Sequence, residues 1–512
     1  MAGWVLVIVA ALALNARVVG FSDLSLMDDD INVYLNPHLG GLTAARLKWI
    51  FGDWHYVRRY MPPGWLTFSA IFEWGGLDAF YYHAAALVYY LINVGFVFLV
   101  IVSGLRVFLP STQLRGLTQR HIVVSLLAAA WWAFHPMRVE STAWISGLLY
   151  GQSMCFFMTG LVAYLRSYIE PHHTMMRRIW LGLAWAGFTA SLFIYPLILS
   201  LPLLLVILDI LYLRTRDRDP LVSFRRLLWE KAIFALPVLA MAFLALYARL
   251  SEKEILGAAP SWTNFTVTKR MVQACCVAAY YVWRPWWPFD LSPCYDTLFE
   301  FNARFWPFVA SVVLVSAVTG LVVIAYRKYP WLTCGWFAHL VMAAPFFGLT
   351  ESPHYTSDRY AYFLTVIAAL AMAAALSAIG NKAIFRVLVG SIAIWVIFLA
   401  RLSYVQQAIW VDSRSLFAHL VKHLSENEIR ENYRGRQLLV DFFEEREQGA
   451  IEALTERLRL HPESAGLSKA LRIMQVFHSS HITCHTPHAL IVPSRLCASY
   501  VKACRLDVRI VL

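Results

Sequence analysis

The stretch that decides the fold runs from residue 83 to residue 105 and reads HAAALVYYLINVGFVFLVIVSGL. It contains no Asp, Glu, Lys or Arg. A helix of this length can cross the hydrocarbon core of a bilayer, which is about 30 Å thick. The stretch therefore predicts a membrane-spanning helix, and similar stretches recur as far as residue 403.

The composition agrees with this interpretation. Hydrophobic residues make up 59% of the 512 residues, charged residues only 15%, and the mean hydropathy is +0.56, which is far outside the range of soluble domains. Most basic residues lie between apolar runs, so the net charge of +12 does not predict nucleic acid as a partner. Eight cysteines without a CxxC motif predict neither a zinc site nor a disulfide framework. The lipid bilayer is the partner that the composition predicts.

Eleven apolar segments are long enough to span a membrane. They lie at residues 4–20, 83–105, 121–137, 147–165, 179–195, 197–213, 231–248, 305–326, 331–349, 360–379 and 387–403. The first has no basic residues before its core, so we expect an uncleaved anchor rather than a signal peptide. The shorter stretch 271–283 is followed by Trp and Pro, and we expect a re-entrant or interfacial helix there. The predicted fold class is an all-α polytopic membrane protein with about 11 transmembrane helices.

The distribution of charge orients this bundle. With the amino terminus inside, the inside loops hold sixteen Lys and Arg against four Asp and Glu, and the longer outside loops hold twelve against fifteen. The positive-inside rule then places the first loop (20–82), residues 350–359 and the C-terminal tail on the non-cytoplasmic side. If residues 271–283 spanned the membrane, the orientation of everything after them would be reversed.

The first outer loop opens with three adjacent acids, Asp28, Asp29 and Asp30. Neighbouring carboxylates repel one another and raise the pKa of at least one member, which suits a general base or a metal clamp. An acidic, solvated turn that helps to set the topology is the alternative interpretation.

Several short motifs accompany these acids. They are Val33, Asn36-Pro37-His38, Leu42, Trp49-Ile50-Phe51, Trp65-Leu66, Gly75-Gly76-Leu77 and Tyr82-His83 in or next to the first loop, His135-Pro136-Met137-Arg138-Val139-Glu140-Ser141 with Ala143-Trp144-Ile145-Ser146, then Trp287-Pro288 with Leu291-Ser292-Pro293, and Asp358-Arg359-Tyr360 with Tyr362. Together they resemble the transmembrane and tetratricopeptide-repeat O-mannosyltransferases and their bacterial relatives over residues from about 5 to 465. The string from 135 to 146 is the most specific part.

This resemblance implies a GT-C type transmembrane glycosyltransferase domain over residues 1–403. It implies inverting transfer of a mannose-like sugar from a polyprenyl phosphate to an acceptor hydroxyl, on protein Ser/Thr or on a glycan, at the non-cytoplasmic face. The bilayer would be a bacterial inner membrane, or the endoplasmic reticulum in a eukaryote. Asp28 and Asp29 match the paired acids that are regarded as catalytic in the relatives. Asp30 is an additional acid, so which two of the three form the pair stays open.

The chemistry of such a transfer suits these residue types. A carboxylate takes the proton of the acceptor hydroxyl, and a cation or metal stabilises the departing phosphate. Arg138 and Arg359 are the candidates for the phosphate because a guanidinium can bind it with two hydrogen bonds. Ion pairs with the nearby Glu140 and Asp358, respectively, are the alternatives.

The remaining candidates have supporting roles. Asn36, His38 and Tyr360 belong to the motifs, while lone histidines such as His38 and His354 are more often structural than metal ligands. Glu351, His354 and Asp358 with the first-loop acids offer a divalent cation site, although their spacing matches no recognised metal motif. No other cofactor is expected, and the metal stays unknown.

After residue 403 the chain becomes charged and helix-periodic. We expect an amphipathic helical region at 404–470, in which 431–464 resembles one degenerate tetratricopeptide repeat. Residues 471–512 match no pattern, and we expect an irregular tail.

The main alternative function is non-enzymatic, as a transporter or flippase of lipid-linked sugars. Such a protein should carry ionisable residues or broken helices at mid-membrane. Asp209 is the main ionisable residue within the expected spans, and the polar groups gather in the outer loops instead. This distribution favours the enzyme. A ligase or polymerase acting on lipid-linked glycans would share the architecture but lacks the matching first-loop motif.

Overall fold

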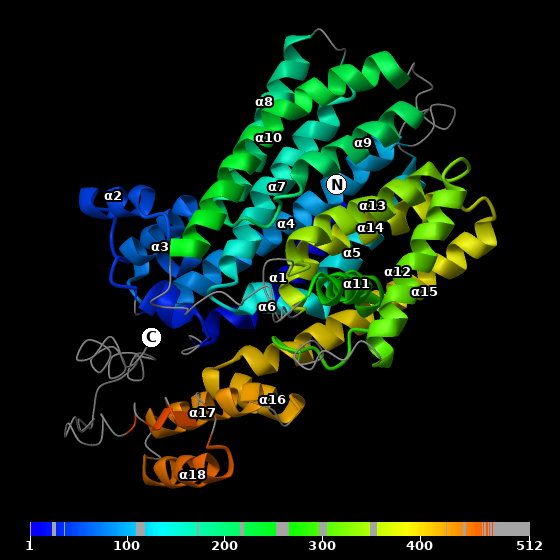
Figure 1. Ribbon diagram of the computed structural model, residues 1–512. Helices are drawn as coiled ribbons and strands as arrows, with labels where there is room; N and C mark the ends of the chain where they lie inside the picture. Colours follow the sequence, from blue (N-terminus) through cyan, green and yellow to red (C-terminus); the bar gives the residue numbers. More distant parts are fainter. Residues whose placement is uncertain are drawn as a thin grey trace.

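A computed structural model describes residues 2–22, 27–34, 36–108, 118–170, 174–215, 220–251, 266–295, 305–348, 356–425, 428–443 and 447–462, with isolated positions between 464 and 474. Within these residues every regular element is a helix, and the long helices form one bundle (Figure 1). The predicted all-α class is confirmed.

The long helices are α1 (Ala2–Asn15), α4 (Ala79–Phe108), α5 (Gln119–Ala133), α7 (Leu148–Ser167), α8 (Met175–Ile194), α9 (Leu201–Thr215), α10 (Pro220–Ser251), α11 (Val267–Trp283), α12 (Trp306–Ala325), α13 (Pro330–Ala343), α14 (Ala361–Ala378) and α15 (Lys382–Gln406). Short helices join them: η1 (Ala16–Gly20), η5 (Pro136–Arg138), α6 (Val139–Ala143), η6 (Arg284–Trp286), η8 (Ala344–Phe346) and η9 (Asp358–Tyr360).

A helix lies at each of the eleven expected positions, but fewer helices qualify as spans. Among the described residues, seven helices are long and apolar enough to cross a membrane, or eight if the bent pair of α5 with η5 and α6 is one span. The described residues thus support seven or eight spans, where the sequence predicts about eleven. Helices α9 and α13 have 15 and 14 residues, fewer than the roughly 20 that a span needs, and α8 carries two arginines in its first turns. Helix α11, with 17 residues, also falls short of a full span.

Helix α7 lies at the centre of the bundle. It packs mainly against α4 and α8, and 78% of its apolar window is buried, against 6% for α12 and 11% for α15. The crossing of α7 and α8 is close because both contribute a glycine: a Cβ on Gly187 would lie 2.8 Å from the backbone nitrogen of Gly160. Small residues allow such approach between membrane helices.

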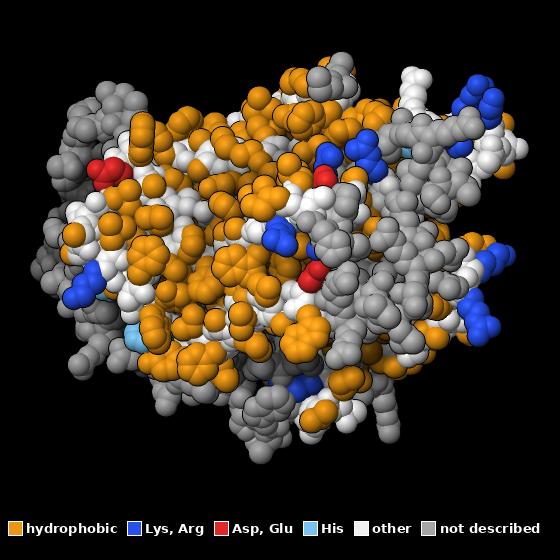
Figure 2. Space-filling model, turned by 90° about the horizontal axis from the view of Figure 1, so that it is seen from above, with side chains coloured by type: hydrophobic (Ala, Val, Ile, Leu, Met, Phe, Trp, Pro, Cys, Tyr) orange, Lys and Arg blue, Asp and Glu red, His pale blue; other side chains and the backbone are white. Residues whose placement is uncertain are grey.

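The outer helices expose their apolar side chains. Leu236, Leu239 and Phe243 of α10 and Ile394 and Ile397 of α15 are among the most exposed large hydrophobic residues. Hydrophobic side chains dominate the face shown in Figure 2. An apolar surface of this extent requires lipid rather than water around it. The chain is thus an integral, multi-pass membrane protein.

The first loop folds into four short helices: η2 (Asp30–Tyr34), α2 (Ala44–Gly52), η3 (Tyr56–Arg58) and α3 (Pro62–Gly75). Thr43 caps α2, and the two prolines at the start of α3 occupy positions where no backbone donor is needed. The loop has its own apolar core, built on Val57, Trp65 and Phe68, which packs against the first turns of α4 and α7. Helix α4 begins at Ala79, so the loop ends a few residues before the expected boundary at 82.

The C-terminal region is helical, as expected. Helix α15 extends to Gln406, and η10 (Gln407–Trp410), α16 (Ser413–His423), α17 (Glu428–Phe443) and α18 (Glu447–Leu460) follow. Helices α17 and α18 pack together within the window 431–464, where Arg457 forms an ion pair with Glu431 at 2.6 Å. Similarity to a tetratricopeptide repeat stays a prediction, and almost all of residues 471–512 lie outside the described residues.

The start of the first loop and the start of the C-terminal region meet at the same end of the bundle (Figure 1). The backbone nitrogen of Ser22 donates to the carbonyl of Val411 at 2.9 Å, and Trp144 Nε1 donates to the carbonyl of Met27 at 2.9 Å. The indoles of Trp144 and Trp410 lie 6.5 Å apart.

We predict that this end faces away from the cytoplasm. Single cysteines introduced at the exposed residues 54, 78 and 411 should react with a membrane-impermeant maleimide from the non-cytoplasmic side, because the loops opposite carry the excess of Lys and Arg. A cysteine at residue 382, at the start of α15, should react only after the membrane is opened. The reverse labelling pattern would contradict the orientation.

Candidate active site

The three first-loop acids point into three different environments. Asp29 is fully buried, and its Oδ1 accepts hydrogen bonds from the backbone nitrogen of Ser146 at 2.8 Å and from the Ser146 hydroxyl at 2.6 Å. Asn32 donates to the same hydroxyl at 2.9 Å. Asp29 therefore fastens the first loop to the turn that precedes α7, which is a structural task.

Asp30 lies in the π-helical turn η2 and is partly buried. Burial and, next, the charge of Asp28 raise the pKa of Asp30 to about 6. The positive charge of Arg436, on α17, acts in the opposite direction. Asp30 therefore lies close to the C-terminal helices.

Asp28 is the most open of the three, with 43% of its side chain exposed. Its backbone is left-handed, with φ of 66°, a conformation that Asp adopts more readily than most residues. One carboxylate oxygen lies 3.9 Å from Nη2 of Arg59. Asp28 is thus the first-loop acid with an oxygen available to a substrate.

Asn36 and His38 shape the loop. The Asn36 side chain donates to the carbonyl of Asn32 at 3.3 Å and accepts from the backbone nitrogen of His38 at 3.0 Å. The His38 ring stacks on Trp49 with 4.5 Å between centroids, and burial lowers its pKa. These contacts support the loop core rather than the acids.

Glu140 and Arg359 form the central ion pair. Arg359 Nη1 lies 2.6 Å from Glu140 Oε1, and the backbone nitrogen of Arg359 donates to Glu140 Oε2 at 2.8 Å. The two ion pairs considered as alternatives, Arg138 with Glu140 and Arg359 with Asp358, are not formed. Glu140 forms its ion pair with Arg359 instead, and Asp358 accepts hydrogen bonds from tyrosines. Arg359 Nε donates to the hydroxyl of Tyr150 at 3.1 Å.

Asp358 is buried next to that pair. It accepts hydrogen bonds from Tyr280 at 2.6 Å and from Tyr295 at 3.1 and 3.2 Å. Its neighbour Tyr360 stacks on Phe346 with 4.2 Å between centroids. Asp358 therefore holds the start of α14 against α11 and the segment that follows it, and Tyr360 holds it against η8, which follows α13.

Arg138 is enclosed in the bundle, with 2% of its surface exposed. Nη2 donates to Thr365 at 2.8 Å, and the guanidinium lies over the rings of Trp132 and Tyr362. Nε and Nη1 have no hydrogen-bond partner among the residues that the structure describes. The structure therefore does not place Arg138 on the open face where Asp28 and Arg359 lie.

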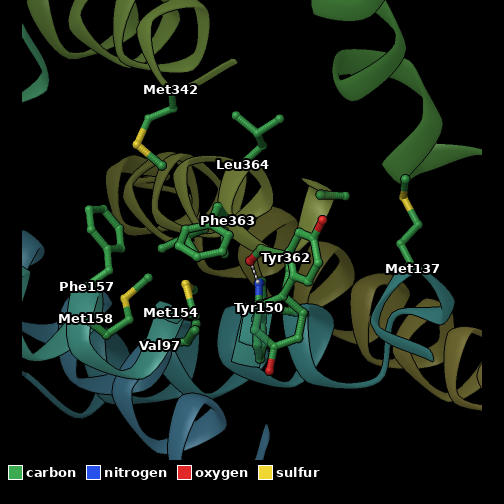
Figure 3. Close-up of a cluster of buried hydrophobic side chains, with 14 of the residues drawn as sticks. Val97, Met137, Tyr150, Met154, Phe157, Met158, Met342, Tyr362, Phe363 and Leu364 are labelled. Atoms are coloured by element: carbon green, nitrogen blue, oxygen red, sulfur yellow. Dashed lines mark hydrogen bonds between the residues drawn. The ribbon is translucent and has the colours of Figure 1, made fainter. Parts of the chain in front are cut away.

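Two tyrosines connect Asp28 with Arg359. The guanidinium of Arg59 lies over the Tyr195 ring at 5.4 Å, the Tyr150 hydroxyl donates to the Tyr195 hydroxyl at 3.4 Å, and Tyr150 accepts from Arg359. Tyr150 of α7 and Tyr362 of α14 both belong to the buried group drawn in Figure 3. The first loop, α6, α7, η9 and the end of α8 thus contribute to one polar cluster, made of Asp28, Arg59, Tyr150, Tyr195, Arg359 and Glu140.

Sequence reasoning did not identify Arg59, Tyr150 and Tyr195 as site residues. Arg59 is one of four basic residues in the first loop, so its charge and its place in the same loop as the acids offered a signal. Tyr150 and Tyr195 lie in apolar helix ends, where tyrosines are common as interface residues, and they offered none.

An apolar cavity of about 400 Å³ lies inside the bundle, between α4, α7, α9, α13 and α14. Phe363, one helical turn after Arg359, lines its near end together with Met342, and both belong to the group drawn in Figure 3. Ala378 and Lys328 line its far end. The cavity thus follows α14 through much of the bundle.

Asp209 does not belong to the cluster. It forms a buried ion pair with Lys231 at 2.7 Å and accepts a hydrogen bond from Tyr164 at 2.8 Å. Lys231 therefore neutralises the acid within the bundle.

The metal prediction is not tested. Glu351 and His354 lie outside the described residues. Within the part of the chain that is described, no three His, Cys, Asp or Glu side chains are grouped so as to hold a metal ion.

Comparison with known proteins gives little support from sequence. No protein-family model matches the chain, and no curated protein matches it. The predicted membership of the O-mannosyltransferase family is therefore not confirmed.

Two solved structures are similar to this chain. One is the crystal structure of ArnT from Cupriavidus metallidurans bound to undecaprenyl phosphate, with a TM-score of 0.39 and 14% identity, covering 100% of this chain and 76% of that one. The other is ArnT from the same organism in the apo state, with a TM-score of 0.42 and 13% identity, covering 99% and 76%. At this level of similarity no residue of this chain is assigned a counterpart.

We predict that Asp30 makes stability depend on pH. Its raised pKa means that the folded chain keeps a proton that the unfolded chain has lost between pH 4 and pH 6, so ionising Asp30 destabilises the fold as the pH rises through about 6. The Asp30→Asn variant lacks this loss. In detergent, its Tm should exceed that of the wild type by about 2–4 °C above pH 6, and the difference should disappear near pH 4. A difference that does not change with pH would contradict the assignment.

Proposed function

We propose that the chain is a membrane glycosyltransferase of the GT-C type. It transfers a mannose-like sugar from a polyprenyl phosphate to an acceptor hydroxyl, on a protein Ser/Thr or a glycan, at the non-cytoplasmic face. One observation carries the proposal: Asp28 and Arg359, from opposite ends of the membrane domain in sequence, meet in one polar cluster at one end of the bundle. Transfer from a phosphate-linked donor needs such an acid beside such a cation.

Asp28 is the proposed base. The acceptor oxygen attacks the anomeric carbon, the bond from that carbon to the phosphate oxygen breaks, and the acceptor proton passes to the Asp28 carboxylate. The polyprenyl phosphate leaves with the electron pair of the broken bond. Asp29 is unsuited to this task because it is fully buried and bound to Ser146.

Arg359 is the proposed partner of the donor phosphate. Its side chain is 17% exposed, and Glu140 and Tyr150 fix the plane of the guanidinium without using Nη2. Holding a cation rigidly before charge develops on the leaving group is the main way in which a protein stabilises such a transition state. Arg138, enclosed behind Tyr362, adds positive charge without touching the phosphate and is a positioning residue in this proposal.

The apolar cavity suits the chain of the carrier. Apart from Lys328 at its far end, its described lining has no charged side chain. Its near end at Phe363 lies one helical turn from Arg359. A polyprenyl chain in this cavity would be withdrawn from the bilayer while its phosphate lies at the cluster. A transport path for a sugar would instead need polar groups along its length.

The test is transfer of radiolabelled mannose from a polyprenyl phosphate to peptides containing Ser and Thr, measured with the purified chain. Asp28→Asn keeps the size of the side chain but cannot take the proton, so the transfer rate should fall by about 10²- to 10⁴-fold with an unchanged Tm. Asp29→Asn should mainly lower the Tm, because it puts an amide in a buried site built for a carboxylate. Asp30→Asn should have the mildest effect on transfer.

Wild-type transfer by Asp28→Asn would show that Asp28 is not the base. Movement of the labelled lipid across the membranes of proteoliposomes, without any glycosylated product, would favour the flippase alternative.

A second prediction concerns the cavity. A Cβ on Gly335 of α13 meets nothing within 4 Å, so Gly335→Phe would place its ring in the cavity without disturbing the backbone. The KM for a long-chain donor of eleven isoprene units should rise by about 10-fold or more, because each displaced CH₂ forfeits about 0.8 kcal/mol of burial. A donor with a chain of two isoprene units should be affected much less.

Gly320→Phe on α12 is the matched control, because a Cβ there also meets nothing within 4 Å and Gly320 does not line the cavity. Equal KM values for the long-chain donor in the two variants would contradict binding of the chain in this cavity.

A further inference from the structure

The segment that delivers Arg59 to the cluster has a strained backbone. Val57 and Arg58 both adopt left-handed conformations, with φ of 51° and 57°. A β-branched residue rarely does so, because its Cβ then crowds the following carbonyl. Such strain persists only where the surrounding structure imposes it, and it is typical of functional sites.

The surroundings do impose it. The side chain of Val57 is buried in the core of the first loop, with 2% of its surface exposed. Asp53 accepts hydrogen bonds from the backbone nitrogens of His55 and Tyr56 at 3.0 and 2.7 Å, and this fixes the start of the turn. The surrounding contacts thus hold the strained turn at Val57 and Arg58, and this turn sets the position of Arg59.

Within the described part of the chain, the guanidinium of Arg59 forms one ion contact, to Asp28, and has further N–H donors for a ligand. Its contact with Asp28, at 3.9 Å, is longer than a hydrogen bond between charged groups, which is about 2.7–2.9 Å. The side chain of Arg59 is 27% exposed, and its guanidinium lies over the ring of Tyr195, 5.4 Å from the ring centroid. Arg359 binds the other side of the same tyrosine pair, through the Tyr150 hydroxyl. Two arginines therefore face one another across Tyr150 and Tyr195.

We propose that Arg59 is a second phosphate-binding residue, which pairs with Asp28 in the empty site and exchanges Asp28 for the donor phosphate when the site is filled. The proposal rests on the function proposed above. A phosphate can accept two short hydrogen bonds from the guanidinium, whereas Asp28 is half-exposed and forms only a loose contact. The exchange leaves the Asp28 carboxylate without its cation, so Asp28 becomes a stronger base for the acceptor when a donor is bound.

Binding of undecaprenyl phosphate, which carries no sugar, separates this role from catalysis. The Kd is measured in detergent by titration calorimetry for the wild type, Arg59→Ala, Arg59→Lys and Asp28→Ala. Arg59→Ala should raise the Kd about 10-fold or more, and Arg59→Lys should raise it less because lysine keeps the charge but not the fork of donors. Asp28→Ala should lower the Kd about 2- to 5-fold, because it removes the competitor for Arg59.

Arg58→Gly is the matched control. Glycine accepts a φ of 57° without strain, so this variant removes the neighbouring positive charge while the turn is kept. Its Kd should equal that of the wild type. The Tm of each variant shows whether it folds. If Arg59→Ala does not fold, the separate variants Arg59→Lys and Asp28→Ala provide the test.

The outcomes are distinct. If the wild type binds the lipid phosphate and Arg59→Ala and Arg59→Lys bind it equally well, Arg59 is only a structural partner of Asp28 and the inference is wrong. A Kd that rises or stays the same in Asp28→Ala would overturn the exchange. A wild type that does not bind undecaprenyl phosphate would contradict the proposed function itself.

Discussion

A single buried ion pair, between Glu140 and Arg359, joins the two parts of the candidate site. Removing such charges from water is costly, and in a membrane bundle it is tolerated only when each charge has a partner. Glu140 satisfies both the side chain and the backbone nitrogen of Arg359, so it fixes where η9 ends and α14 begins. This contact sets the distance between η9, which carries Arg359, and the turn at α6, which carries Glu140.

That turn also holds the first loop. The chain bends by 60° between α5 and the segment of η5 and α6, which brings Glu140 inward and leaves the following turn open to the loop. Asp29 then binds Ser146, and Trp144 binds the carbonyl of Met27. These contacts lie on both sides of Asp28. The acid that is proposed to act is therefore placed by residues bonded to its neighbours, while its own side chain keeps an open face.

The membrane class could be predicted because apolar length is a local property, and each expected span contains a helix. The number of spans could not, since α9 and α13, with 15 and 14 residues, are shorter than the apolar runs at the same positions. At the site, the sequence predicted that Asp28, Glu140 and Arg359 would lie at one end of the bundle. Their partners were not predictable: Glu140 lies close in sequence to Arg138, but pairing inside a bundle follows tertiary packing, which brought Arg359 from more than two hundred residues away. Tyr150 and Tyr195 carry no sequence signal that separates them from interface tyrosines.

The three adjacent acids show why residue type and spacing alone do not define a catalytic group. Asp29 is fully buried and bound to Ser146, and Asp30 is partly buried in η2, where burial raises its pKa. Asp28 is left with an exposed oxygen and a weakly held cation. The three acids are equivalent in the sequence. The backbone turns at Asp28, so their side chains point in different directions and lie in three different environments. In the proposed exchange, the left-handed residues at 28, 57 and 58 hold the Asp28 carboxylate and the Arg59 guanidinium 3.9 Å apart, a contact longer than a hydrogen bond between charged groups.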